Sequence, residues 1–219
     1  MRSTAWVEQT FGQIPYTEGS KRGSIVIAPA WTAANIIVVP NRWGILSYTG
    51  KLARIECHRL VAPRIVALLD DLERNGLLGL IKTWDGCFVP RHKCWNPTRA
   101  LSRHSWGIAV DLNASRFPYG VRDWQDSRLI ATFHRYGFEW GGDWSTPDPM
   151  HFELISLDSV PSDLVGVKVV VNDKLVSTAG RIVAGQAEGP LAPILAALGY
   201  RVTVHEEQRK IYVYPEKRP

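Results

Sequence analysis

Residues 102–113 read SRHSWGIAVDLN, and this segment carries the strongest structural signal in the chain. Apolar side chains alternate with small or polar ones from Ile108 to Leu112, which is the pattern of a strand that packs one face on a core. Asp111 therefore lies on the face opposite the apolar residues. His104 precedes the strand, and Gly107 between them permits the chain to turn. The segment predicts a half-buried strand that presents a carboxylate, with a histidine just before it.

A second strand is predicted near residue 150, in the segment 141–154, which reads GGDWSTPDPMHFEL. The alternation places His151 and Glu153 on the face opposite the apolar side chains of this strand. If the two strands are neighbours in a sheet, then His104, Asp111 and His151 converge.

Two imidazoles and one carboxylate form a ligand set that suits Zn²⁺ at roughly 2.0–2.2 Å. Three protein ligands leave a fourth position for water, and a catalytic zinc lowers the pKa of that water to about 7. Asp148, three residues before His151, is the candidate general base that takes the proton and returns it to a leaving amine. Asp143 is a rival base that lies further from His151 along the chain. Each residue alone is more often structural, so the prediction rests on their coincidence in type and spacing.

The two segments together resemble a known enzyme family. The pattern Ser-x-His-x-x-Gly-x-Ala-x-Asp at 102–111, followed by Asp-x-x-His at 148–151, is similar to that of the D-Ala-D-Ala carboxypeptidase and L-Ala-D-Glu endopeptidase family of zinc peptidases. This family includes vancomycin-resistance carboxypeptidases and many phage endolysins. The resemblance covers roughly residues 25–155, by the usual size of such domains.

The resemblance implies a role for five residues of this chain. His104, Asp111 and His151 match the family's zinc ligands, and Asp148 matches its catalytic acid/base. Arg91 resembles the family's arginine upstream of the first ligand, which would steady the oxyanion of the tetrahedral intermediate. Arginines at 99 and 103 are close to it in the sequence.

The expected fold class is α+β, with a small antiparallel sheet and flanking helices that carry the zinc site. Strands are predicted at 24–28 and 36–39, where β-branched runs are closed by proline. Helices are predicted at 63–75 and 123–136, the second with Asp123 as its N-cap.

A change in composition near residues 157–163 predicts two domains. All nine tryptophans lie between Trp6 and Trp144, and no Trp, Cys or Phe follows Phe152. We expect a catalytic domain at 1–158 and a small β-β-α-β-β domain at 165–219, whose helix spans 190–198. The second domain resembles the copper amine oxidase N-terminal-like domain. It is expected to bind a cell-wall polymer, or to serve as a structural or dimerising appendage.

Cys87, His92 and Cys94 form a second group of potential metal ligands. A structural zinc site usually has four ligands, so these three favour a free thiol pair or an incidental disulfide over a bound metal. Trp106 and Trp144 flank the proposed site, where each is expected either to line a cleft or to join the core.

Composition and charge exclude several classes of function. The chain has 26 Lys and Arg against 21 Asp and Glu, a net charge of +5 without a basic stripe, so nucleic acid is not an expected partner. No apolar run reaches the roughly 18 residues of a membrane helix, so no membrane partner is expected. The first residues lack the apolar core of a secretory signal peptide, which predicts synthesis in the cytoplasm.

These observations predict a zinc-dependent peptidase that hydrolyses a bond in the stem peptides of peptidoglycan. By analogy with the family, we favour an L-Ala-D-Glu endopeptidase, a bacteriolytic phage or prophage endolysin that acts at the bacterial cell wall. The alternatives are a D-Ala-D-Ala carboxypeptidase and a non-catalytic wall-binding protein whose zinc site is structural or lost.

Overall fold

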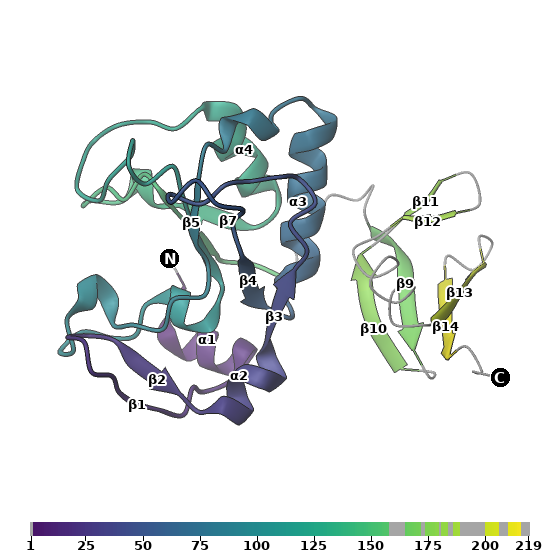
Figure 1. Ribbon diagram of the computed structural model, residues 1–219, viewed down its shortest axis with the longest axis horizontal. Helices are drawn as coiled ribbons and strands as arrows, with labels where there is room; N and C mark the ends of the chain where they lie inside the picture. The colour runs from purple at the N-terminus through teal and green to yellow at the C-terminus, as the bar shows by residue number, and fades with distance from the viewer. Residues whose placement is uncertain are drawn as a thin grey trace.

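A computed structural model describes residues 2–157 with their side chains and, between residues 165 and 215, the backbone of the strands (Figure 1). The α-helices of the first part are α1 (Thr4–Phe11), α2 (Pro29–Asn35), α3 (Ala62–Arg74) and α4 (Ser127–Arg135). Its short 3₁₀ turns are η1 (Leu78–Leu80), η2 (Lys93–Trp95), η3 (Arg103–Trp106) and η4 (Gly141–Asp143). Its strands are β1 (Tyr16–Glu18), β2 (Ile25–Ile27), β3 (Ile36–Val39), β4 (Ile55–His58), β5 (Trp84–Gly86), β6 (Ala109–Leu112), β7 (Phe138–Trp140) and β8 (His151–Leu154). The predicted α+β class is confirmed for this part.

The largest sheet of this part has the order β5-β6-β8-β7, with every neighbouring pair antiparallel. The two strands predicted from sequence alternation are adjacent, and Asp111 on β6 pairs with His151 on β8. Ile108, Val110 and Leu112 are fully buried, as their period-2 spacing predicts. The register therefore places the carboxylate and the second histidine side by side.

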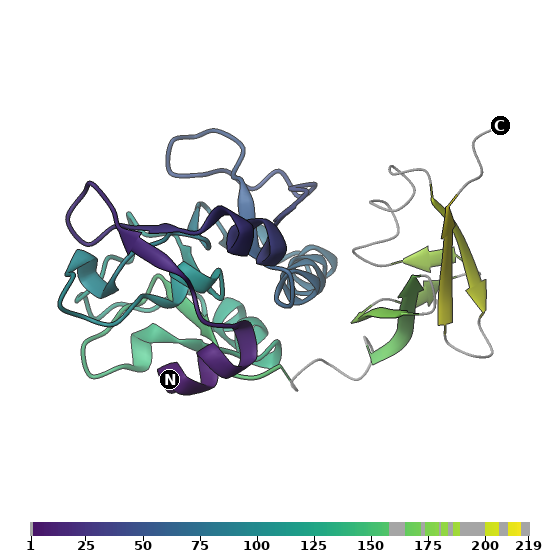
Figure 2. The same ribbon diagram turned by 90° about the horizontal axis from the view of Figure 1, so that it is seen from below.

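Helices α3 and α4 lie side by side against the core (Figures 1 and 2). The prediction of a helix at 63–75 is confirmed, because α3 ends at Arg74 and buries its stripe of leucine and isoleucine side chains. The predicted start of α4 is wrong. The helix begins at Ser127 and its N-cap is Asp126, whose carboxylate accepts a hydrogen bond from the Arg128 amide. The carboxylate of Asp123 instead accepts from the Trp124 amide, in a turn before the helix.

Two antiparallel hairpins complete the first part, and they confirm the strands predicted at 24–28 and 36–39. Strand β2 pairs with β1, and β3 pairs with β4. The hairpin β1–β2 also meets the segment that follows β5, through a bridge between Ser24 and Arg91. This contact becomes important at the site, because Arg91 lines it.

Six strands are described in the second part of the chain. They are β9 (Val165–Val171), β10 (Lys174–Ala179), β11 (Arg181–Val183), β12 (Gln186–Glu188), β13 (Tyr200–His205) and β14 (Lys210–Pro215). One sheet has the order β10-β9-β14-β13, and β11 pairs with β12. The helix expected at 190–198 lies outside the described residues, and the division into domains at 1–158 and 165–219 stays a prediction.

No helix in the described parts of the chain combines the length and the apolar character needed to cross a bilayer.

A buried histidine in the core makes the stability of the first part depend on pH. His58 ends β4, is 1% exposed and packs edge-to-face on Phe11. Burial, together with the charge of Arg59, lowers the pKa of its imidazole to about 4. The unfolded chain takes up this proton near pH 6.5, whereas the folded protein does not, so stability is lost as the pH falls from about 6.5 towards 4.

Because of this histidine, we expect the free energy of unfolding to fall by about 2 kcal/mol when the pH is lowered from 7.5 to 5. Each unit of pKa difference corresponds to about 1.36 kcal/mol. The measurement is urea denaturation followed by tryptophan fluorescence at both pH values. His58→Asn should flatten the pH dependence, since the amide oxygen can still accept from the Leu60 amide as Nδ1 does. The exposed His134 supplies the control His134→Asn, which should keep the wild-type slope. An unchanged slope in His58→Asn would contradict the assignment.

Candidate functional site

Three side chains that are distant in the sequence converge at one end of the β6–β8 pair. His104 Nε2 lies 3.1 Å from Asp111 Oδ2 and 3.2 Å from His151 Nδ1, and His151 Nδ1 lies 2.9 Å from Asp111 Oδ1. His104 comes from η3, and the other two residues are paired across the sheet. The structure therefore brings together the three residues that the sequence predicts as metal ligands, and they could hold a metal ion.

The donor atoms of this cluster fit the requirements of zinc. Atoms bound to one tetrahedral zinc at roughly 2.0–2.1 Å are separated by about 3.3 Å, close to the separations seen here. The remaining ring nitrogens have their own partners. His104 Nδ1 lies 3.0 Å from the Cys87 carbonyl oxygen, and His151 Nε2 lies 3.5 Å from Glu153 Oε2. Such acceptors keep the proton on the outer nitrogen and turn the lone pair of the inner one towards the cluster.

The charges of the cluster are strongly coupled. Burial alone would lower the pKa of His151, but the hydrogen bonds to Asp111 and Glu153 outweigh it and raise that pKa to about 10. Burial likewise opposes ionisation of Asp111, but the two histidines hold the pKa of its carboxyl well below the usual range. A divalent cation would take the place of the proton among these ligands.

Asp148 lies beside the cluster in a rigid loop. The Asp148 amide donates to the Gly141 carbonyl at 2.8 Å, and the His151 amide donates to the Asp148 carbonyl at 3.0 Å. Trp140 Nε1 and Gln125 Nε2 both donate to the carbonyl of the next residue, Pro149. A Cβ atom at position 141 would lie 2.6 Å from the Asp148 carbonyl oxygen, so this approach requires glycine.

The carboxyl group of Asp148 has the properties expected of a proton carrier. Its Oδ1 atom is buried and has no hydrogen-bond partner among the described residues. Burial raises the pKa of this carboxyl above its usual value, and the charges of His151, His104 and Arg91 oppose that rise. A carboxyl that is easier to protonate than usual is better suited to accept and return a proton near neutral pH.

Arg91 approaches the cluster from the segment that follows β5. Its Nη2 atom lies 3.9 Å from Asp111 Oδ2, and its guanidinium stacks over the Trp95 ring at 5.5 Å. Arg99 and Arg103, the arginines near it in the sequence, also line the cleft, but among the three only Arg91 has an ion pair with a residue of the cluster in the described part of the chain. The guanidinium is therefore placed where it can act on a substrate bound at the cluster.

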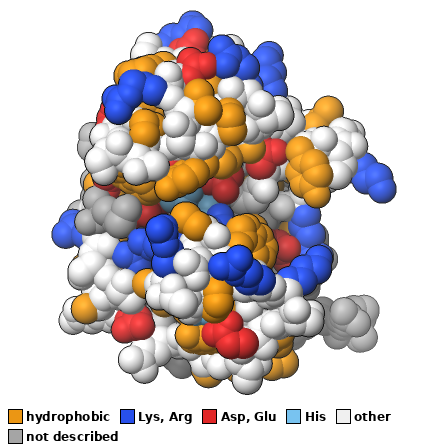
Figure 3. All heavy atoms as spheres, turned by 90° about the vertical axis from the view of Figure 1, so that its left-hand side faces the viewer, with side chains coloured by type: hydrophobic (Ala, Val, Ile, Leu, Met, Phe, Trp, Pro, Cys, Tyr) orange, Lys and Arg blue, Asp and Glu red, His pale blue; other side chains and the backbone are white. Residues whose placement is uncertain are grey.

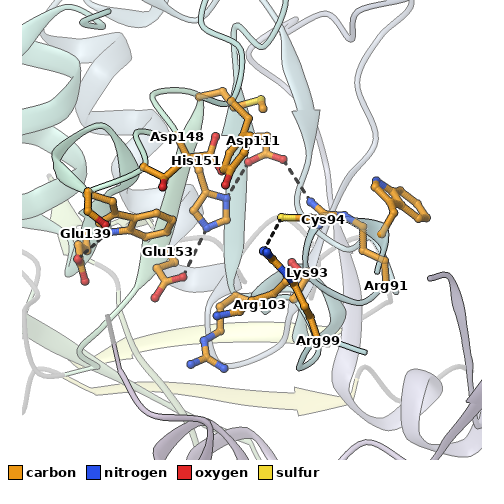
Figure 4. Close-up of a pocket in the computed structure, with 17 residues that line it drawn as sticks. Arg91, Lys93, Cys94, Arg99, Arg103, Asp111, Glu139, Asp148, His151 and Glu153 are labelled. Atoms are coloured by element: carbon orange, nitrogen blue, oxygen red, sulfur yellow. Dashed lines mark hydrogen bonds and ion pairs between the residues drawn. The ribbon is translucent and has the colours of Figure 1, made fainter. Parts of the chain in front are cut away.

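The cluster opens into a cleft with a volume of about 760 Å³. A space-filling view of this face shows a hollow with histidine at its floor (Figure 3). The side chains along its walls are seen in Figure 4. The cleft is lined by Arg91, Lys93, Cys94, Trp95, Arg99, Ser102, Arg103, Asp111, Tyr119, Glu139, Trp144, Ser145, Thr146, Asp148, Met150, His151 and Glu153.

The two tryptophans that flank the site in the sequence have different roles. Trp144 lines the cleft, with its ring 5.3 Å from that of His151 and its Nε1 donating to Glu139. Trp106 is 1% exposed and donates to the Gly12 carbonyl, so it belongs to the core and anchors the end of α1. The rival base Asp143 is exposed and does not line the cleft.

The second group of potential ligands does not form a metal cluster among the described residues. Cys87 is buried and Cys94 is exposed, and both are free, so the predicted disulfide alternative is wrong. His92 is occupied elsewhere: its Nδ1 lies 2.6 Å from the Arg99 carbonyl oxygen and its Nε2 lies 2.9 Å from Glu18 Oε1. These residues shape the loop next to the cleft.

Sequence reasoning missed several residues that line the cleft, above all Lys93, Tyr119 and Glu139. None of them belongs to a spaced motif or to a strand predicted near the site. Only the tertiary packing of separate segments brings them to the cleft.

Glu153 is expected to orient His151 for metal binding. It is 2% exposed and lies 3.5 Å from His151 Nε2. We expect Glu153→Gln to weaken zinc affinity roughly 10–100-fold, because loss of such a carboxylate lets the imidazole rotate and lowers its basicity. The measurement is competition with a chromophoric chelator. Glu139→Gln changes a carboxylate that lines the same cleft and accepts a hydrogen bond from Trp144 Nε1, and it should retain wild-type affinity. Equal affinities for the two variants would contradict this role.

Comparison with known proteins gives one match, and it covers the segment that carries the site. Residues 95–154 match a family model described as D-alanyl-D-alanine carboxypeptidase. The matched segment contains the three residues of the cluster and Asp148, and it begins after Arg91. It supports the resemblance to zinc peptidases and covers less than a third of the chain. No curated protein matches the chain. The resemblance of residues 165–219 to the copper amine oxidase N-terminal-like domain finds no support in these comparisons.

Proposed function

We propose that this protein is a zinc-dependent peptidase that hydrolyses a peptide bond in the stem peptides of bacterial peptidoglycan. One observation carries the proposal. Two buried histidines and a half-buried aspartate lie in a cleft beside a carboxyl oxygen of Asp148 that has no hydrogen-bond partner among the described residues. All four residues fall within the segment that matches a D-alanyl-D-alanine carboxypeptidase family model. A structural zinc site has no need of such a carboxyl group.

The residues have the following roles in this proposal. His104 Nε2, His151 Nδ1 and one oxygen of Asp111 hold the zinc ion. Zinc, when bound, supplies a water of lowered pKa and polarises the carbonyl of the peptide bond. Asp148 takes the proton of the attacking water and delivers it to the leaving amine. The Arg91 guanidinium stabilises the negative charge that develops on the carbonyl oxygen.

Two peptide bonds are candidates for hydrolysis. The description of the matching family favours the terminal D-Ala-D-Ala bond. The analogy with endolysins drawn from the sequence favours the L-Ala-D-Glu bond, with lysis of the cell wall as the result. The products differ, because a carboxypeptidase releases free D-alanine whereas the endopeptidase separates the stem peptide after its first residue.

Digestion of purified peptidoglycan tests the proposal. The full chain, loaded with zinc, should release new stem-peptide ends or free D-alanine, and mass spectrometry of the fragments identifies the bond. Treatment with a chelator should abolish release, and added zinc should restore it. Absence of release by the zinc-loaded protein from walls of several chemistries would contradict the proposal and favour a wall-binding protein.

A further inference from the structure

One wall of the cleft is strongly cationic. Arg91, Lys93, Arg99 and Arg103 all come from the segment between β5 and the end of η3, and all line the cleft. In Figure 4 they lie together on one side of the site, and the carboxylates Glu139 and Asp148 lie on the other. Lys and Arg side chains also gather along one rim of the hollow in Figure 3. Together, these four residues are called the basic wall.

The backbone beneath the basic wall is held in an unusual conformation. Cys94 and Trp95 both have a φ of 54°, in the left-handed region that few residues other than glycine adopt. Gly23, in the turn before β2, makes room for this loop, because a Cβ atom there would lie 2.2 Å from the Trp95 carbonyl group. The His92 amide donates to the Gly23 carbonyl at 2.8 Å. Such strain persists only where surrounding contacts impose it, and it is concentrated at functional sites.

His92 connects the loop to the hairpin β1–β2. Its Nε2 atom contacts Glu18 on β1, and its Nδ1 atom donates to the carbonyl of Arg99. His92 therefore ties the backbone at Arg99 to strand β1. The backbone that carries the basic wall is held in place before a ligand binds, which lowers the ordering cost of binding.

The side chains of the basic wall differ in the partners they have among the described residues. Arg103 is 4% exposed, and its Nε and Nη1 atoms have no hydrogen-bond acceptor there. Burial and the charge of Arg103 lower the pKa of Lys93, and the charge of Glu153 opposes that shift. Arg99 Nη1 has the Cys94 sulfur, a weak acceptor, at 3.3 Å. The carboxylate that contacts Arg91 is Asp111, which also faces both histidines of the cluster.

We propose that Lys93 and Arg99, at the open side of the basic wall, bind a carboxylate of the substrate close to the bond that is cleaved. This inference rests on the proposed function, since a peptide held at the cluster must extend along the cleft past these residues. A carboxylate forms short, charge-assisted hydrogen bonds with guanidinium and ammonium groups. Lys93 is half-buried, which strengthens such a bond, whereas Arg99 is exposed at the mouth of the cleft. Its source is either the α-carboxylate of the D-glutamate residue or the carboxyl terminus of the stem peptide.

Two pairs of synthetic stem peptides separate these sources. One pair carries the D-glutamate α-carboxylate either free or as the amide, and the other carries the C-terminus either free or as the amide. For the wild-type protein we expect kcat/KM to be at least tenfold higher for the free form of one pair, mainly through a lower KM. The pair that shows the preference identifies the carboxylate.

Variants of the basic wall test the assignment to Lys93 and Arg99. Arg99→Gln and Lys93→Met should each lower kcat/KM for the free carboxylate far more than for the amide, and so remove most of the preference. The matched controls are Arg22→Gln and Lys51→Met, which change exposed residues that do not line the cleft and should retain the preference. An equal loss on the free and amidated peptides, or an undiminished preference, would overturn the inference.

Binding measurements separate this inference from the proposed function. Isothermal titration calorimetry of the same peptides uses the chelator-treated full chain, which cannot turn them over. Tighter binding of a free carboxylate that Arg99→Gln abolishes supports the carboxylate site, even if the zinc-loaded protein cleaves none of the peptides. If amidation changed neither binding nor turnover by the wild-type protein, the carboxylate site would be overturned. Normal cleavage of these peptides would still support the peptidase assignment.

Discussion

Replacement of a cluster residue should abolish both zinc binding and peptidase activity. Loss of a residue that only hydrogen-bonds a metal ligand typically reduces metal affinity or activity roughly 10–100-fold. We expect His151→Ala to reduce activity on peptidoglycan by more than this. Asp111→Asn should have a similar effect, because it removes a negative charge from among the ligands with almost no change in shape. The measurements are metal content after dialysis and the rate of release of stem-peptide ends.

A control histidine separates metal binding from general damage to the fold. His134 is exposed on α4, so His134→Ala should keep both zinc and activity. Circular dichroism checks the folding of each variant. His151→Ala leaves a cavity where the buried ring was, whereas Asp111→Asn keeps the shape of the side chain, so a loss in both variants is not due to the cavity. If folded Asp111→Asn and His151→Ala retained bound zinc and full activity, the cluster would not be the metal centre.

Loss of the Asp148 carboxylate should separate catalysis from metal binding. We expect Asp148→Asn to lower kcat by about 10²–10⁴-fold, the usual contribution of a general acid or base. Zinc content should stay at the wild-type level, because Asp148 is not among the three converging ligands. The buried Oδ1 atom has no hydrogen-bond partner in the described part of the chain, so the amide can replace the carboxyl group without breaking a contact of that atom.

The rival base provides the matched control for this variant. Asp143 lies in η4 of the same loop, is exposed and does not line the cleft, so Asp143→Asn should turn over substrate at the wild-type rate. A large loss in Asp143→Asn with none in Asp148→Asn would exchange the two assignments. If both variants kept full function in a wall-binding assay and the wild type showed no turnover, the protein would be a binding module.

Local patterns in the sequence predicted much of the fold around the site. Alternation identified β6 and β8, because a strand with one buried face must alternate its side chains. The buried apolar face of α3 was predicted equally well from the helical spacing of its apolar residues. The start of α4 was missed, because Asp123 and Asp126 are both plausible caps and only the turn geometry selects between them.

Within the site, the three converging residues and Asp148 could be singled out from the sequence because their spacing belongs to a motif. The basic wall was not predicted, since Lys93 and Arg99 belong to no repeat or periodic element. The structure places their loop through contacts of His92 with Gly23 and Glu18, which lie far earlier in the chain.

The sequence by itself identified the candidate ligands, the candidate base and the two half-buried strands, because strand alternation and motif spacing act over a few neighbouring residues. Tertiary structure alone decided that Glu153 is buried against His151 and not solvated, that Trp106 is core whereas Trp144 lines the cleft, and that Cys87 and Cys94 do not meet. Such outcomes depend on how separate segments pack and on which buried polar groups find partners, and that packing is a property of the whole chain.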